Sequence, residues 1–171
     1  MPFTEIPGDL FVDSNPTDAL AHCVSQDLRM GKGIATIFKE RFNGIAELKR
    51  QNKKVGEVAY LHRQNRYIFY LITKPTAWDK PTEEDFKKSL TELRKLCEQF
   101  EVSGLSLPRI GAVCAIKIII GIKFSILRIT FIRSCNTNKA SLVQIVEITI
   151  VYEIEAVIQR NRNIFQVFQY H

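Results

Sequence analysis

The stretch Ala19–Phe42 reads ALAHCVSQDLRMGKGIATIFKERF and contains three different kinds of sequence in a row. Its first six residues form a compact, mainly apolar run, which is typical of a strand buried on both faces. A polar loop with two glycines follows. From Ile34 onward, apolar side chains recur at i, i+3, i+4 and i+8, which is one face of a helix. Strand, glycine loop and helix in this order predict one unit of an α/β fold.

The segments on either side continue this alternation. Turn residues separate further stretches with strand patterning, at residues 3–6, 56–62, 67–73 and 104–107, and the middle two flank a polar turn as in a β-hairpin. The residues from Thr82 to Asp85 resemble a capping box, and the helical stripe that follows extends to about Phe100. Residues 3–111 therefore predict a single α/β domain with a mixed sheet.

The charge of the chain is unevenly distributed. The 171 residues carry a formal charge of +6. Residues 1–111 hold 17 lysines and arginines against 15 acidic residues, whereas residues 112–171 hold 7 against 3. A positive charge suits an anionic ligand but identifies none. Because the basic residues are diffuse and lack interleaved aromatic side chains, specific binding to nucleic acid is not expected.

The cysteines and the first twenty residues bear on metal binding and location. The four cysteines lie far apart without a CxxC pair, and no histidine stands at ligand spacing, so we expect reduced thiols and no metal site. Cys23 and Cys97 lie in apolar runs and are expected to be buried. The first twenty residues are polar, so we expect no signal peptide and a nuclear and cytoplasmic location.

The apolar stretch Ile110–Ile132 is long enough to cross a membrane. Its 13 residues of type Ile, Val, Leu or Phe favour insertion by about 4–8 kcal/mol. Lys117, Lys123 and Arg128 oppose insertion by about 8–10 kcal/mol. We therefore expect no membrane span.

Residues at several positions could act on a ligand, and each also has a purely structural interpretation. The glycine loop before the helix and the PRIG turn at 108–111 could together hold a diphosphate, or their glycines could serve packing. Asp9 could accept a hydrogen bond from an adenine amino group or cap a turn. Ser25 could orient a sugar hydroxyl or cap a loop. Lys74, at the end of a strand, could attack an electrophilic carbon or simply be exposed there.

Six motifs are similar, in order and spacing, to those of the terminal ADP-ribose protein glycohydrolases, small single-domain members of the macro domain superfamily. They are GDLF, DALAHCVSQD, RMGKGIA, GEVAYL, RYIFYLITK and LSLPRIG, and all fall within residues 3–111. The resemblance implies a three-layer α/β/α macro domain with a mixed central sheet. It also implies a monomer that binds ADP-ribose and ADP-ribosylated proteins, needs no cofactor and acts in the DNA damage response.

The resemblance assigns roles to individual residues. Asp9 and Leu10 correspond to the adenine end of the ligand site, and Ser25 to a serine that contacts the ligand. The two phosphate-binding loops correspond to Gly31, Gly33, Ile34 and Ala35 and to Arg109, Ile110 and Gly111. Lys74 matches the family's catalytic lysine, proposed to attack the anomeric carbon of the distal ribose and so release ADP-ribose from a glutamate ester. Related macro domains also deacetylate O-acetyl-ADP-ribose.

After Gly111 the sequence departs from the family pattern. The family continues with a motif like CGLD, whose aspartate is its second catalytic residue, but here Ala112 to Ala115 replace that motif and no aspartate follows Asp85. Residues 112–171 also hold 14 isoleucines, against seven in the first 111 residues, and no proline. We hypothesise that this divergent tail derives from an altered reading frame or noncoding sequence, with 146–154 resembling the family's terminal strand.

Three functions are compatible with this sequence. The first is a hydrolase that removes ADP-ribose from glutamate through Lys74 and is impaired by the missing aspartate. The second is a reader that binds ADP-ribose without catalysis. The third is a non-functional variant product.

Overall fold

The protein is described by a computed structural model over residues 3–108 and 128–133. The strands in these ranges are β1 Phe3–Pro7, β2 Ala19–Ser25, β3 Val58–Arg63, β4 Arg66–Lys74, β5 Gly104–Pro108 and β6 Arg128–Arg133. The helices are α1 Ile34–Phe42, α2 Ile45–Arg50 and α3 Glu83–Gln99. The predicted strands and helices up to residue 108 are all present, with bounds that shift by two residues or fewer.

The strands form one mixed sheet in the order β1-β6-β5-β2-β4-β3. Among the described strands, β3 and β4 form the one antiparallel pair, and the other pairs are parallel. The carboxyl ends of parallel strands meet at one edge of a sheet, where open α/β sheets bind their ligands. The carboxyl ends of β1, β2, β4 and β5 therefore lie at the same edge.

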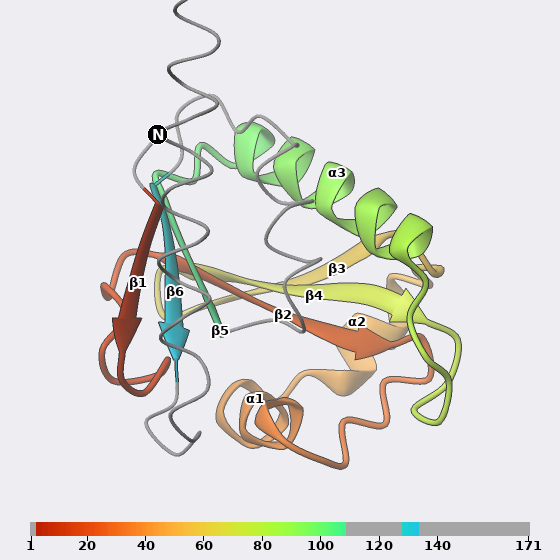
Figure 1. The fold of residues 1–171 in the computed structure, drawn as a ribbon. Coiled ribbons are helices and arrows are strands. Elements are labelled where there is room, and N and C mark those ends of the chain that lie inside the picture. Colours follow the sequence, from red (N-terminus) through yellow and green to blue (C-terminus); the bar gives the residue numbers. More distant parts are fainter. Residues whose placement is uncertain (1–2, 109–127, 134–171) are drawn as a thin grey trace, which may run out of the picture. The chain divides into compact units, whose positions relative to one another are not determined.

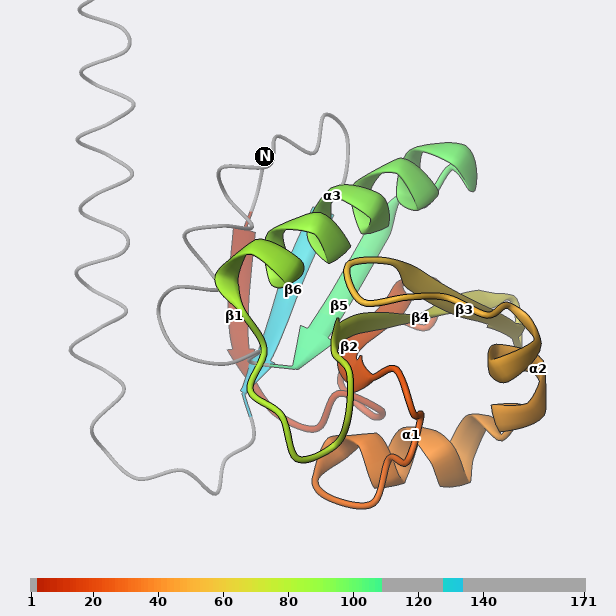
Figure 2. The ribbon, with the colours of Figure 1, turned by 90° about the vertical axis from the view of Figure 1, so that its right-hand side faces the viewer.

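Helices cover both faces of the sheet, as Figures 1 and 2 show, with α3 on one side and α1 and α2 on the other. Successive side chains of a strand point to opposite faces, and β4 divides its residues in this way. Phe69 and Leu71 join a core cluster with apolar residues of α3, whereas Ile68 and Tyr70 join a second cluster with residues of α1 and α2. The predicted three-layer α/β/α arrangement is confirmed.

Local sequence signals explain the turns and caps between these elements. The hairpin between β3 and β4 turns at Gln64 and Asn65, with φ of 50° and 63°. Two left-handed residues in a row suit the right-handed twist of the flanking strands. At the start of α3, the Thr82 side chain accepts a hydrogen bond from the backbone of Asp85 at 3.0 Å, as the capping-box pattern predicts.

One element, the short helix α2 between α1 and β3, was not predicted. The strand β6 lies in the divergent tail, where the partly alternating β-branched residues 126–132 make a strand possible. β6 fits between β1 and β5 and pairs in parallel with both, so the sheet includes residues beyond Gly111. Residues Met1–Cys135 form one compact unit. The stretch 146–154, expected to resemble a terminal strand, lies outside the described residues.

No helix in the described part of the chain is both long enough and apolar enough to cross a membrane. Most of Ile110–Ile132, the stretch tested above for its hydrophobicity, lies outside the described residues.

Candidate active site

The predicted site residues follow the ends of parallel strands. Asp9 and Leu10 come after β1, Ser25 ends β2 and Lys74 ends β4. Ser25 and Lys74 are register partners in the β2–β4 ladder, where an irregularity follows Val24. Three further predicted residues, Arg109, Ile110 and Gly111, follow β5 but lie outside the described residues.

A cavity of about 330 Å³ lies at this edge of the sheet. Four of the predicted residues line it: Ser25, Gly31, Ala35 and Lys74. The other lining residues are Cys23, Val24, Arg29, Met30, Lys32, Ala77 and Trp78. The cavity therefore joins the end of β2, the glycine loop, the start of α1 and the turn after β4. Gly33 and Ile34 adjoin this lining without being part of it.

Lys74 is half-buried and held by the turn that follows it. Its Nζ donates to the carbonyl oxygens of Ala77 and Asp79, each at 3.0 Å. The turn is closed by Asp79 Oδ2, which accepts hydrogen bonds from the backbone N–H of Thr76 at 2.9 Å and from its hydroxyl at 2.7 Å. Lys74 is thus fixed at the cavity wall and does not extend freely into solvent.

The glycine loop brings a helix N-terminus to the cavity. Gly33 precedes α1 with φ of +62°, a conformation that side chains rarely adopt. The first amides of α1 have no partner within the helix, and they carry the positive end of its dipole. Ala35, in this first turn, lines the cavity beside Gly31 and Lys32. An anionic group such as a phosphate is the ligand that this arrangement favours.

Two non-glycine residues of the same loop also have a left-handed backbone. Leu28 has φ of 51° and Met30 has φ of 44°, and both side chains are buried. Such conformations are unfavourable for ordinary residues and tend to occur at functional sites. The buried side chains hold the loop in this shape, which keeps its backbone against the cavity.

Ser25 is buried, and its hydroxyl donates to Asp27 Oδ1 at 2.5 Å. Because this hydrogen bond uses the hydroxyl proton, Ser25 can offer a ligand only its acceptor lone pairs. Desolvation raises the pKa of Asp27, but hydrogen bonds from Ser25, Arg29 and Ala77 and the charge of Arg29 outweigh it and hold the pKa below its usual value. Asp27 is therefore a charged carboxylate at neutral pH.

Asp9 and Leu10 do not line the cavity. Asp9 is exposed, and its Oδ1 accepts the backbone N–H of Phe11 at 2.7 Å, so it caps a turn, as the structural interpretation predicts. Leu10 is buried in the core cluster that also contains Phe38 of α1. Among the described residues, the second carboxylate oxygen of Asp9 has no hydrogen-bond donor, so it can accept one from a ligand.

The rim of the cavity has a cation–π pair that the sequence did not single out. The Arg29 guanidinium lies 5.0 Å from the centre of the Trp78 ring. Trp78 is 74% exposed although it is the one tryptophan of the chain. The sequence could have pointed to Trp78 through its position in the loop after Lys74. An exposed aromatic ring close to a candidate nucleophile offers a surface for substrate.

The thiol in the cavity is a poor nucleophile. Cys23 lines the cavity, and burial raises its pKa to about 12. The reactive form of cysteine is the thiolate, which is scarce at such a pKa. Cys23 and Cys97 are both free cysteines, with Cys97 buried and Cys23 half-buried. Two amines also line the cavity, those of Lys32 and Lys74, and the turn after β4 holds the nitrogen of Lys74 in place.

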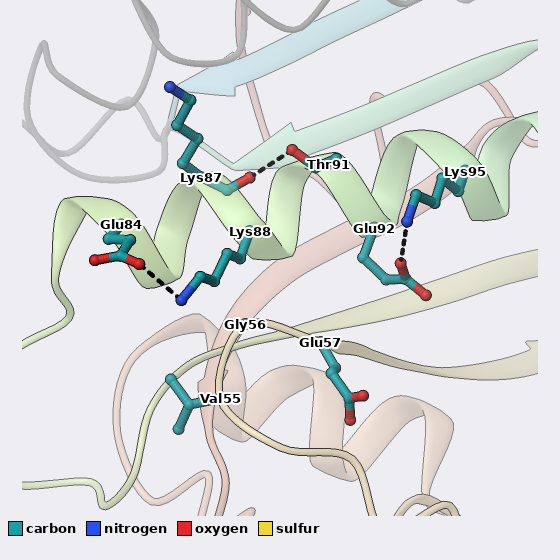
Figure 3. A pocket seen from close by; sticks show the side chains of 9 residues that line it. All are labelled: Val55, Gly56, Glu57, Glu84, Lys87, Lys88, Thr91, Glu92 and Lys95. Atoms are coloured by element: carbon teal, nitrogen blue, oxygen red, sulfur yellow. Dashed lines mark hydrogen bonds and ion pairs between the residues drawn. The ribbon is translucent and has the colours of Figure 1, made fainter.

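A second, larger hollow of about 480 Å³ lies between α3 and the segment that precedes β3 (Figure 3). Its charged residues largely satisfy one another. Lys88 pairs with Glu84 at 2.8 Å, and Lys95 pairs with Glu92 at 3.4 Å, all along one helix. Paired charges on an open helix face are typical of a solvated surface, so this groove is a weaker candidate for a site.

In the ranges 3–108 and 128–133, no cluster of three or more His, Cys, Asp or Glu side chains is placed to hold a metal ion.

Comparisons with known proteins complete this description. No protein-family model matches the chain. The human protein ADP-ribose glycohydrolase OARD1 is 54% identical over 108 residues, which cover 63% of this chain and 70% of the human protein. The Bos taurus protein of the same name is 53% identical with the same coverage.

Solved structures share the fold at low sequence identity. The macrodomain of Thermus aquaticus DarG superposes with a TM-score of 0.66 at 21% identity, covering 78% of this chain and 97% of that one. Thermosipho africanus DarTG, solved in complex with ADP-ribose, gives a TM-score of 0.65 at 13% identity and covers 81% of this chain and 44% of that one. The predicted macro domain fold is confirmed.

Proposed function

The chain belongs to the macro domain family, as a relative of ADP-ribose glycohydrolase OARD1, and on this premise we propose that it is an ADP-ribose-binding hydrolase. The substrate would be a protein with ADP-ribose on a glutamate side chain, and O-acetyl-ADP-ribose is a second ester of the same kind. The single observation that supports this most strongly is Lys74, fixed in the wall of a cavity that also receives the glycine loop and the start of α1.

The proposal gives each predicted residue a task. Lys74 is the nucleophile that attacks the anomeric carbon of the distal ribose and displaces the glutamate carboxylate. Ser25 accepts a hydrogen bond from the ligand. The diphosphate binds between the loop of Gly31, Gly33, Ile34 and Ala35 and the loop of Arg109, Ile110 and Gly111. The turn at Asp9 and Leu10 receives the adenine.

A second candidate function is binding without turnover. It is favoured by the sequence after Gly111, where Ala112 to Ala115 stand in place of the motif with the second catalytic aspartate. Alanine cannot act as a general base, so a lysyl adduct would be resolved slowly. We therefore propose impaired catalysis in this chain, with ADP-ribose binding retained.

Two measurements on the full chain test the proposal. Calorimetry with ADP-ribose measures binding, and release of ADP-ribose from a glutamate-modified protein measures turnover. We expect ADP-ribose to bind, turnover to be slow, and Lys74→Ala to show no turnover. Lys87→Ala is the matched control, because Lys87 lies on α3 in the second hollow. Binding without any release would favour the reader, and absence of both would reject the proposal.

The proposal also covers the origin of the divergent tail and the oligomeric state, location and cellular process of the protein. Sequencing the transcript across the codon for Gly111 tests the altered reading frame, and one uninterrupted exon through Ile132 would contradict it. We propose a monomer that is nuclear and cytoplasmic and acts on ADP-ribosylated proteins in the DNA damage response. Gel filtration with light scattering and imaging of the tagged chain before and after DNA damage check these points.

A further inference from the structure

Asp27 joins the three segments that surround the cavity. Its Oδ1 accepts the hydroxyl of Ser25 at 2.5 Å and the backbone N–H of Arg29 at 3.2 Å, and its Oδ2 accepts the backbone N–H of Ala77 at 3.2 Å. Ser25 ends β2, Arg29 belongs to the glycine loop and Ala77 lies in the turn after β4. One exposed carboxylate therefore connects the strand, the loop and the turn.

The contacts of Lys74 leave one direction of its nitrogen open. An amine nitrogen on a single carbon has three further tetrahedral positions. The carbonyl oxygens of Ala77 and Asp79 take two of them. Lys74 lines the cavity, and no described residue accepts a hydrogen bond at the third position. In the charged ammonium this position holds an N–H, and in the neutral amine it holds the nucleophilic lone pair.

Ala77 links these two sets of contacts. Its N–H is held by Asp27, and its carbonyl oxygen holds Lys74. We propose that Asp27 is a positioning residue for Lys74, which fixes Ala77 and thereby directs the reactive lone pair of the lysine into the cavity. This inference rests on the proposed function, because it takes Lys74 as the nucleophile.

The substitution Asp27→Asn separates this role from general support of the loop. All three partners of the carboxylate are donors. Asparagine offers one acceptor oxygen and one NH₂ group. If the oxygen keeps the contacts to Ser25 and Arg29, the NH₂ group faces the N–H of Ala77, and two donors cannot bond to each other. The variant is nearly the same size and breaks the link that leads to Lys74.

The test uses ADP-ribose itself, because its distal ribose opens to an aldehyde at C1. The full chain is incubated with ADP-ribose and sodium cyanoborohydride. The lysine amine condenses with the aldehyde and releases water, and hydride from cyanoborohydride reduces the imine to a stable secondary amine. Intact mass and peptide mapping follow the adduct at Lys74, while calorimetry gives the Kd. Lys74→Ala measures background reaction at other amines, such as Lys32 in the same cavity.

We expect Asp27→Asn to slow adduct formation at saturating ADP-ribose by about tenfold or more, with the Kd changed by less than about threefold, because misplacement of a reacting group affects rate more than binding. Asp85→Asn is the matched control, since Asp85 lies at the start of α3 and does not line the cavity. It should react like the wild type.

Other outcomes separate the inference from the proposed function. Equal adduct rates in wild type and Asp27→Asn would overturn the positioning role and leave the proposed function standing. A loss of affinity as large as the loss of rate would also overturn it, because Asp27 would then serve binding. If the wild type neither binds ADP-ribose nor forms the Lys74 adduct, the proposed function itself fails.

If thermal melting shows that Asp27→Asn does not fold, Asp79→Ala tests the positioning of Lys74 in its place. Asp79 is exposed, and its carboxylate closes the turn through Thr76, so its loss loosens the same carbonyl oxygens around Lys74. A slower adduct rate at unchanged Kd is the expected result. An unchanged rate in folded Asp79→Ala would count against positioning by this turn.

Discussion

His22, in the middle of β2, is fully buried among aromatic rings. It stacks on Phe38 with ring centroids 3.8 Å apart, and Tyr70 meets it edge-on at 4.9 Å. Among the described residues, neither of its ring nitrogens has a hydrogen bond of ordinary geometry. Burial lowers the pKa of His22 to about 3, outweighing the backbone of Cys23, which raises it. The imidazole is therefore neutral in the folded protein at neutral and mildly acidic pH.

This residue should make stability depend on pH. The unfolded chain protonates His22 near its usual pKa of about 6.5, whereas the folded chain does so only near 3. Between these values the unfolded state binds more protons, so stability falls as the pH falls from about 6.5 toward 3. From pH 7 to pH 5 we expect a loss of about 2 kcal/mol from His22 alone.

Urea denaturation of the wild type and of His22→Phe at both pH values measures this contribution. The phenylalanine keeps a ring against Phe38 and cannot titrate, so the variant should lose about 2 kcal/mol less between pH 7 and pH 5 than the wild type. Parallel losses in the two proteins would show that His22 does not titrate as its burial requires.

The two glycines of the glycine loop, Gly31 and Gly33, should differ in how well they tolerate substitution by alanine. Gly33 has φ of +62° with nothing near an added Cβ, whereas Gly31 lacks a positive φ and would meet Arg29 only at 3.9 Å. We expect Gly33→Ala to destabilise the fold by about 1–2 kcal/mol through backbone strain, and Gly31→Ala to change it by less than about 0.5 kcal/mol. Thermal melting compares the two, and equal effects would contradict the backbone argument.

At the level of single residues, the sequence indicates candidate site residues but not the contacts between them. Lys74, Ser25 and the glycine loop are candidates because of their positions at strand ends and the family resemblance, and the structure places several of them around one cavity. The bond from Asp27 to Ala77 spans fifty residues and depends on how two loops meet, so no local pattern indicates it. Likewise, Trp78 and Arg29 form a pair only through folding.

Elements with local signals were predicted well. The helix α3 begins where Thr82 caps it and Glu83, Glu84 and Asp85 occupy the first turn. For β6 the sequence indicates only a possible strand, because the isoleucine-rich tail has few turn residues to separate one strand from the next. Its place between β1 and β5 is set by pairing with residues more than a hundred positions away in β1 and about two dozen in β5, which sequence patterning does not report.

The cap of α3 gives a prediction with a control on the same helix. Thr82→Ala removes the acceptor for the backbone N–H of Asp85 and should destabilise the protein by about 1 kcal/mol. Thr91→Ala removes only a hydroxyl that bonds the Lys87 carbonyl on the exposed face, and we expect a change within about 0.5 kcal/mol. Urea denaturation of both variants tests this; equal losses would contradict the cap.

At the scale of the whole domain, one described segment of the tail, β6, is part of the sheet. Thr130 and Ile132 of β6 are buried, and Ile132 joins the core cluster of α1 and α2. Among the described strands, β1 pairs only with β6. The sequence alone suggested that the domain could be described by residues 3–111, but a sheet without β6 would separate β1 from β5.

Two truncations test the contribution of β6. A chain that ends at Cys135 keeps every described strand, and we expect it to retain one cooperative thermal transition. A chain that ends at Gly111 lacks β6, so β1 loses its partner and the edge of β5 is open. We expect it to melt without a cooperative transition and to aggregate, because unpaired edges invite association. Cooperative melting of the shorter chain would show that β6 is dispensable.

The pairing of β1 with β6 also has a consequence for synthesis on the ribosome. β1 emerges first, yet its neighbour in the sheet is made about 120 residues later. Once β5 is complete at Pro108, the next described strand begins at Arg128, and at about 5–20 residues per second that interval takes roughly 1–4 s. Throughout it the nascent chain exposes both the edge of β5 and the unpaired β1. Slow translation between these strands would lengthen this period, so codon choice in that interval should influence how much of the protein folds and how much is bound by chaperones.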